Sequence, residues 1–305
     1  MAGRGLPVLV GCTAAGKSDV AMTAALKNSA VEIVNGDSRQ LYRGMDIGTA
    51  KPGPRERGMV THHLLDVADP DTLLSAGWYA REAGRIIDGI LEMGGLPLVV
   101  GGSALYLMAL AGMIDPLPPR NDRLRAVLAD LEDGSSGQLF RMLLSIDPES
   151  AATISPSDRV RLIRALEICL ESGAKASSLR RGGTRRGDFR FIMLEADLET
   201  LRRRIDHRVD EMMSHGLYEE VSGLVKMGFR REPVLGHTIG YAELLDCMEG
   251  RRTRTEAVRD IKTNTWRYAR RQRNMFQRLP ELARAATAEV AAELIDWRGA
   301  NGQGN

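Results

Sequence analysis

The chain has 305 residues, of which 43% are hydrophobic and 27% are charged, so it resembles a soluble globular protein with room for one large domain and a smaller one. Its formal net charge is only +2, so a polyanionic partner can be inferred only from where the basic residues lie. Three cysteines without paired spacing argue against a disulfide framework and a zinc site. No apolar stretch is long enough for a membrane span, and a strand-like run starting at Leu6 leaves no room for a signal peptide. We therefore expect a cytoplasmic protein.

Short apolar runs alternate with helical patterns in the first hundred residues. The runs at Leu6–Val10, Val31–Val34 and Leu96–Val100 are typical of strands that are buried on both faces. Helical patterns follow Lys17 and cover about Ala76–Met93. Strands that alternate with helices predict a parallel sheet with right-handed crossovers.

The pattern changes around Asp115–Asp122, where two consecutive prolines stop any helix and Asn121 or Asp122 can cap the next one. Only helices are expected from there to about residue 173, and the Gly-, Arg- and Ser-rich stretch Lys175–Asp188 predicts a mobile connection. A strand then resumes at Phe189–Ala196, and helices are expected to the end. The expected fold is α/β, a phosphate-binding-loop parallel sheet flanked by helices, with core parts at 1–118 and 189–305 and an all-helical insertion domain at 119–188.

A phosphate-binding motif lies between the first strand and the first helix. Its residues fit the pattern G-x-x-x-x-G-K-[ST] and are Gly11, Cys12, Thr13, Ala14, Ala15, Gly16, Lys17 and Ser18. Glycines let backbone N–H groups turn toward phosphate oxygens, Lys17 adds a full positive charge, and the Ser18 hydroxyl suits Mg²⁺. The motif predicts a bound diphosphate or triphosphate. A phosphate-loop ATPase also needs a strand that ends in an aspartate, and the strand at Leu96–Val100 ends in two glycines instead.

Asp37 lies just past the second strand, at the carboxyl edge where open α/β sheets form their ligand crevice. A carboxylate there can ligate a metal or accept a proton from a nucleophile. A helix N-cap explains an aspartate at this point equally well. The local pattern leaves both interpretations open.

Further strings, in this order along the chain, resemble the bacterial tRNA dimethylallyltransferase (tRNA isopentenyltransferase) family. They are "DSRQLYRGMDIGTAKP" at Asp37–Pro52, "HHLLD" at His62–Asp66, "GGSALY" at Gly101–Tyr106, "RALE" at Arg164–Glu167 and "IGYAE" at Ile239–Glu243. The resemblance implies transfer of a dimethylallyl group from dimethylallyl diphosphate to the N6 amine of the adenosine immediately 3′ of the anticodon in tRNA, with release of pyrophosphate.

The resemblance also assigns roles to residues. It implies that Asp37 is the general base, that residues 11–18 hold the diphosphate with Mg²⁺ near Ser18, and that Lys17 stabilises the leaving pyrophosphate. Arg208 is implied to lie over the diphosphate, although a solvated helix face explains it equally well. The residues implied to contact tRNA are Asp37, Ser38, Arg39, Gln40, Ser103 (where the family has Thr), Arg125, Val160, Arg161, Leu162, Ile163 and Arg164.

Basic residues are concentrated between Arg251 and Arg278, where ten Arg or Lys stand against two acidic residues. A solvated helix face is the usual explanation of such a run, but this excess indicates contact with a phosphate backbone. We expect Arg270, Arg271 and Arg273 to contact tRNA.

Two other functions remain as alternatives: a phosphate-loop small-molecule kinase that uses ATP, and a non-catalytic RNA-binding module. The expected partners are the anticodon stem-loop of tRNA and dimethylallyl diphosphate, and the expected state is a monomer.

Overall fold

The structure is a computed structural model that describes residues 5–115, 117–179, 189–279 and 282–295. It divides into two compact units: residues 1–111 with 187–305, and residues 112–186. Of the stretch at 175–188 that we expected to be a mobile connection, residues 176–179 form a short helix, and 180–188 lie outside the described residues.

The larger unit is built on a six-stranded sheet in which every pair of neighbouring strands is parallel. Its spatial order is β3 (His62–His63), β2 (Val31–Asn35), β4 (Leu96–Gly101), β1 (Leu6–Gly11), β5 (Phe189–Leu194) and β6 (Ala283–Ala285). The central strand β1 is buried along its whole length, as its unbroken apolar run predicted. The expected parallel sheet is confirmed. The expectation of helices alone after β5 was wrong, because β6 adds a three-residue edge strand.

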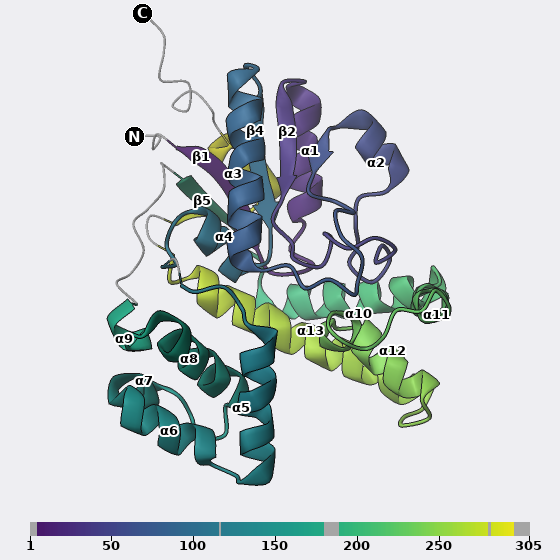
Figure 1. Ribbon diagram of the computed structural model, residues 1–305. Coiled ribbons are helices and arrows are strands. Elements are labelled where there is room, and N and C mark those ends of the chain that lie inside the picture. The colour runs from purple at the N-terminus through teal and green to yellow at the C-terminus, as the bar shows by residue number, and fades with distance from the viewer. Residues whose placement is uncertain (1–4, 116, 180–188, 280–281, 296–305) are drawn as a thin grey trace, which may run out of the picture. The chain divides into compact units, whose positions relative to one another are not determined.

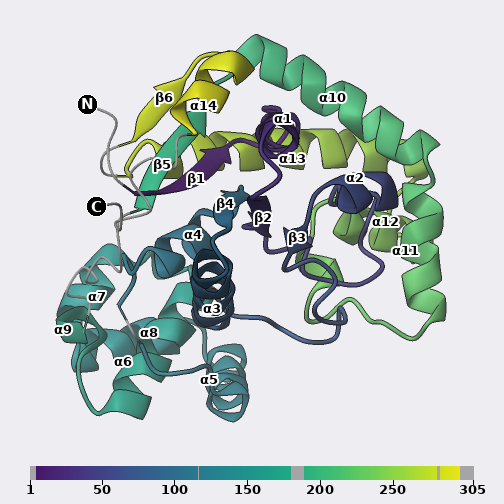
Figure 2. The same cartoon turned by 90° about the horizontal axis from the view of Figure 1, so that it is seen from above.

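Helices cover both faces of this sheet (Figure 2). The helices of this unit are α1 (Lys17–Lys27), α2 (Pro54–Met59), α3 (Ala76–Glu92), α4 (Ala104–Leu110), α10 (Leu198–Ser214), α11 (Leu217–Lys226), η1 (Leu235–His237), α12 (Tyr241–Met248), α13 (Arg254–Phe276) and α14 (Ala288–Leu294). One hydrophobic cluster joins strand residues such as Leu9 and Leu98 to α1 and α14. On the opposite side, α3 packs against α4 and the strands β2 and β4. None of the helices in the described ranges is long and apolar enough to cross a membrane.

Two long helices, α10 and α13, pack against each other and run past the carboxyl ends of the strands (Figure 1). The first turn of α13 is fixed by a capping box, in which Thr253 and Glu256 exchange hydrogen bonds between side chain and backbone. Both helices therefore lie at the edge of the sheet where the phosphate loop and Asp37 emerge.

The smaller unit is helical throughout its described residues. Its helices are α5 (Asp122–Gly134), α6 (Gln138–Ile146), α7 (Pro148–Thr153), α8 (Arg159–Ser172) and α9 (Ala176–Leu179). The Asn121 side chain caps α5 by accepting a hydrogen bond from the Leu124 amide. Leu128, Leu139, Leu143 and Leu166 are among the residues of its own hydrophobic core. An all-helical insertion is confirmed.

Candidate active site

The phosphate loop turns sharply from β1 into α1. Gly16, with φ +98°, adopts the left-handed conformation that favours glycine, and the next residue, Lys17, begins the helix. The Lys17 ammonium donates hydrogen bonds to the carbonyls of Gly11 (2.9 Å) and Cys12 (2.8 Å). Burial lowers the pKa of Lys17 to about 8; Arg208 acts in the same direction, and the Asp37 carboxylate opposes them. Ser18 is exposed at the start of the helix.

Asp37 is held in a tight turn after β2. Its Oδ1 accepts a hydrogen bond from the Arg39 amide (2.8 Å), and its own amide donates to Asn35 Oδ1 (2.9 Å). The residues that follow form turns, so Asp37 does not cap a helix. The other carboxylate oxygen has no hydrogen bond to a described residue, so it remains available to a ligand.

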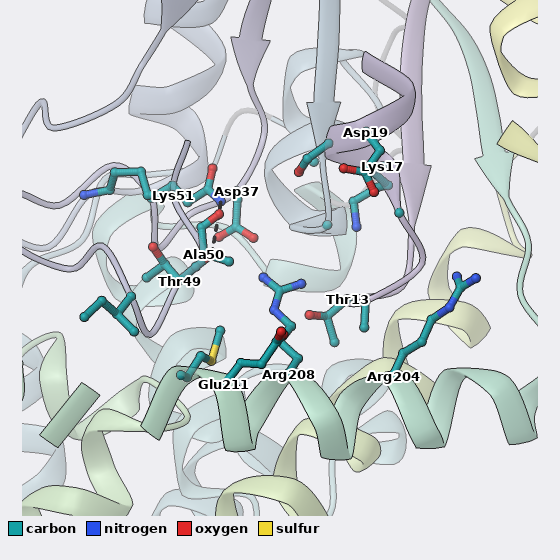
Figure 3. A pocket seen from close by; sticks show the side chains of 18 of the residues that line it. Thr13, Lys17, Asp19, Asp37, Thr49, Ala50, Lys51, Arg204, Arg208 and Glu211 are labelled. Carbon is teal, nitrogen blue, oxygen red and sulfur yellow. Dashed lines mark hydrogen bonds between the residues drawn. The ribbon is translucent and has the colours of Figure 1, made fainter. Parts of the chain in front are cut away.

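A pocket of about 920 Å³ brings the predicted catalytic groups together. Figure 3 shows Lys17, Asp37 and Arg208 reaching into it from the phosphate loop, the turn after β2 and α10. Arg208 is partly buried and has no hydrogen-bond partner among the described residues; burial lowers its pKa, while Asp37 and Asp19 oppose that shift. A guanidinium in this position is suited to an anion that bridges it to the phosphate loop.

A second pocket of about 500 Å³ adjoins the first, because Asp37, Arg208 and Tyr268 line both. Much of its wall is apolar and includes Val209 and Ile261. Asp37 therefore stands between a more polar pocket beside the phosphate loop and a more apolar pocket.

Comparison with known proteins points to one family. A family model described as IPP transferase matches residues 40–279. This chain belongs to the IPP transferase family. It is 40% identical to a tRNA dimethylallyltransferase of Thermotoga maritima over 278 residues, which cover 90% of each chain. It is 39% identical to a tRNA dimethylallyltransferase of Geobacter sulfurreducens, over 91% of this chain and 90% of that protein.

Solved structures give the same family. A tRNA isopentenylpyrophosphate transferase from Bacillus halodurans matches with a TM-score of 0.68 and 35% identity, over 93% of this chain and 90% of that one. A eukaryotic dimethylallyltransferase acting on tRNA matches with a TM-score of 0.78 and 26% identity, over 94% of this chain and 75% of that one. The resemblance inferred from the sequence motifs is confirmed.

In this IPP transferase, the predicted nucleotide contacts next to Asp37 divide between the two pockets. Ser38, Arg39 and Ser103 line the second pocket. Gln40 lines the first pocket, and its amide donates to the carbonyls of Thr49 and Ala50 (both 3.1 Å). The Gln40 side chain therefore stabilises the conformation of the Asp37–Pro52 segment.

The predicted contact residues in the insertion differ from one another in burial and in their partners. Arg125 and Arg164 both bind Glu167, which is fully buried and also accepts a hydrogen bond from the Asn121 amide. Val160 and Arg161 are exposed.

Two of the predicted contact residues in the insertion are buried. Leu162 and Ile163 are 1% and 7% exposed and belong to the core of the unit, so their side chains cannot contact a nucleic acid on its surface.

In the basic segment Arg251–Arg278, fewer cations are available to bind phosphates than the composition suggested. Several of its cations are paired with acidic residues: Arg251 with Asp246 and Glu249, Arg252 with Asp246 and Asp260, Arg259 with Asp260, and Lys262 with Asp210. Arg270, Arg271 and Arg273 form no ion pair with a described acidic residue, and Arg271 also lines the second pocket.

Two residues of α13 that were not among the predicted site residues face the site. Tyr268 lines both pockets, and burial, together with the nearby Asp37 charge, raises its pKa to about 12. Gln272 also lines both pockets and is 3% exposed. Their spacing of four residues places them on one face of the helix. The sequence shows that spacing but not that this face is buried against the site.

Proposed function

We propose that this IPP transferase moves a dimethylallyl group from dimethylallyl diphosphate to the N6 amine of the adenosine immediately 3′ of the anticodon in tRNA and releases pyrophosphate. The observation that supports it most strongly is that Lys17 and Asp37 line one pocket from different strand ends. A diphosphate on the loop would thus have its reactive carbon near a base. The names of the relatives support the same reaction.

The donor end of the site uses fixed positive charge. Residues 11–18 would hold the diphosphate with loop amides, and Lys17 and Arg208 would neutralise it from two sides. As the allylic C–O bond breaks, the electron pair leaves on pyrophosphate, and these groups are already oriented toward that charge.

The residues present are compatible with Mg²⁺. No group of three or more His, Cys, Asp or Glu among the described residues could hold a metal ion. Mg²⁺ does not require such a cage, because it commonly binds one or two protein oxygens together with substrate phosphates and water. The Ser18 hydroxyl offers an oxygen ligand in the first pocket. A bound Mg²⁺ would supply charge neutralisation at the diphosphate.

The acceptor end depends on Asp37. An exocyclic adenine amine is a poor nucleophile, because its lone pair is delocalised into the ring. The carboxylate oxygen of Asp37 that has no partner among the described residues can accept a hydrogen bond from the amine and take its proton as the C–N bond forms. The adenine must leave its stack in the anticodon loop to reach this carboxylate.

The remaining surfaces would bind the rest of the tRNA. Ser38, Arg39 and Ser103 would contact the extruded nucleotide, and Arg270, Arg271 and Arg273 would contact phosphates. In the insertion, expected at 119–188, the exposed Val160 and Arg161 are the best candidates, with Arg125 and Arg164 holding α5 to α8. We propose a monomer that acts on tRNA in the cytoplasm.

One experiment tests the reaction. The protein is incubated with tRNA that lacks the modification, labelled dimethylallyl diphosphate and Mg²⁺, and the label is mapped after nuclease digestion. We expect label on the adenosine 3′ of the anticodon. A parallel reaction with γ-labelled ATP tests the kinase alternative, which β4 disfavours because it ends in glycine rather than aspartate. Unlabelled RNA alongside phosphorylated product would overturn the proposal.

A further inference from the structure

The Gln272 side chain bridges two loops that lie far apart in the sequence. Its Oε1 accepts a hydrogen bond from the Thr13 amide in the phosphate loop (2.9 Å), and its Nε2 donates to the Gly102 carbonyl after β4 (2.9 Å). A backbone amide can only donate and a carbonyl can only accept, so these partners fix the orientation of the Gln272 amide. The bridge thus requires a side chain with both a donor and an acceptor.

The bridge continues toward Asp37. The Ser103 amide, next to Gly102, donates to the Gly36 carbonyl (3.2 Å). The Ser103 hydroxyl accepts from the Ser38 amide (2.9 Å). One path of bonded neighbours therefore runs from the phosphate loop through Gln272 to the two residues that flank Asp37.

Packing leaves this bridge little freedom. A Cβ added at Gly102 would lie 2.4 Å from Gln272 Nε2. One turn earlier on the same helix, the Ala269 carbonyl accepts a hydrogen bond from Cys12 Sγ (3.3 Å), so α13 contacts two consecutive residues of the phosphate loop. A buried amide without either partner would carry an unsatisfied polar group, which favours the bridged geometry.

We propose that Gln272 is a positioning residue that sets the placement of the phosphate loop relative to Asp37. This proposal rests on the proposed function, in which the loop holds the reactive carbon and Asp37 the attacking amine. Transfer requires those atoms at about 3–3.5 Å, and small misplacements cost large factors in rate. Gln272 forms its hydrogen bonds to the two loops, through Oε1 and Nε2. It acts by fixing the two loops that hold the reacting groups.

The test uses Gln272→Met, which keeps the length of the side chain and removes both hydrogen bonds. Single-turnover rates are measured at saturating tRNA over a range of donor concentrations. Removing two bonds of typical strength should raise the half-saturating donor concentration about tenfold and lower the rate at saturating donor about tenfold. The affinity for tRNA should not change. Binding of inorganic pyrophosphate, measured alone, should weaken in parallel with the donor.

The control is Asn264→Leu on the same helix, because the Asn264 amide bonds to Glu243 (2.7 Å) and lines neither pocket. That variant should melt at a lower temperature with unchanged kinetics per folded molecule. Gln272→Met behaving in the same way would overturn the proposal, since a purely structural role moves only the melting temperature. A wild-type protein that transfers no label would instead refute the proposed function.

A second variant breaks the bridge from the other side. Gly102→Ala places a methyl group 2.4 Å from Gln272 Nε2, so it should displace that amide and reproduce the donor and rate defects with Gln272 intact. If both changes act through one bridge, the double variant should be no worse than the more impaired single variant. Defects that multiply to about a hundredfold would show independent effects and would overturn the proposal.

Discussion

The hydroxyl of Ser103 accepts a hydrogen bond from the backbone amide of Ser38 (2.9 Å) and donates one to the Ser38 hydroxyl (3.0 Å). The contact links the loop after β4 to the turn that carries Asp37, although 65 residues separate the two serines. Ser103 is 8% exposed, so its hydroxyl is bonded within the protein rather than to solvent. The orientation of Asp37 therefore depends on a side chain from the loop after a neighbouring strand.

Ser103→Ala should consequently slow the chemical step without weakening the donor. Removing the hydroxyl leaves the Ser38 amide unpaired, and we expect a roughly tenfold lower single-turnover rate. The affinity for dimethylallyl diphosphate should stay near wild type, because the phosphate loop is untouched. Ser103→Thr retains the hydroxyl and serves as the matched control. Equal rates for the alanine and threonine variants would contradict this role.

The pKa of Lys17 predicts how donor affinity depends on pH. Because its pKa is lowered to about 8, the ammonium of the free protein loses its charge as the pH rises through 8. Donor affinity, measured by titration between pH 7 and 9.5, should fall over that range. The free energy of unfolding, in contrast, should rise with pH between about 8 and the ordinary pKa of 10.5. In that range the Lys17 side chain binds more protons in the unfolded chain than in the folded protein.

Two variants separate Lys17 from other titrating groups. Lys17→Ala should bind the donor weakly at every pH in that range. Lys17→Arg keeps its charge, so whatever affinity it has should not fall near pH 8. A wild-type affinity that stays flat to pH 9.5 would show that Lys17 does not titrate there.

The sequence predicted the parts of the site whose residues are contiguous or follow a strand. Residues 11–18 form one local motif, and Asp37 follows a strand that ends at the same sheet edge, so pattern alone brought them together. Tyr268 and Gln272 reach the same pockets from a helix more than two hundred residues later. Their position depends on how α13 packs across the sheet, which spacing along the chain does not contain.

Short elements and mixed helix faces account for the other differences. β3 and β6 have two and three residues, too few for a hydrophobic period to register. In α8, the motif resemblance took residues 160–164 as one contact segment. Consecutive residues of a helix point in different directions, so Leu162 is buried while Arg161 is exposed. The four-residue spacing of Leu162 and Leu166 is the pattern of a buried face.

The unpaired arginines of α13 predict the salt dependence of tRNA binding. Neutralising Arg270, Arg271 and Arg273 to Gln should flatten the slope of log affinity against log salt by roughly 0.7–0.9 for each phosphate that the variant no longer binds. Donor affinity should be unchanged. The slope is measured by filter binding or fluorescence over several salt concentrations.

A matched control neutralises three cations that already have acidic partners, Arg251, Arg259 and Lys262. Their charges are compensated, so the slope should remain close to wild type. If both triple variants flatten the slope equally, the effect reports net charge rather than contact by Arg270, Arg271 and Arg273.

Glu167 predicts the stability of the helical unit. It is fully buried and bonded to Arg125, Arg164 and the Asn121 amide, so Glu167→Ala would leave two arginines without their carboxylate. Breaking a buried ion pair in this way typically costs about 3–5 kcal/mol. Hydrogen exchange should show weaker protection in α5 and α8, with the sheet unaffected. Glu149→Ala removes an exposed acid of the same unit and should leave protection in α5 and α8 unchanged.

Asp37→Asn tests the general base directly. The amide oxygen of Asn can still accept the Arg39 hydrogen bond, so the turn should persist, but the side chain can no longer take a proton. General-base catalysis typically contributes about 10²–10⁴-fold, and the single-turnover rate should fall on that order. Donor binding should stay near wild type. If Asp37 served mainly as a metal ligand, donor affinity in a Mg²⁺ titration would weaken instead. A near-normal rate would exclude the base role. That result is expected if Asp37 only forms the turn, because asparagine replaces a turn-forming aspartate at little cost.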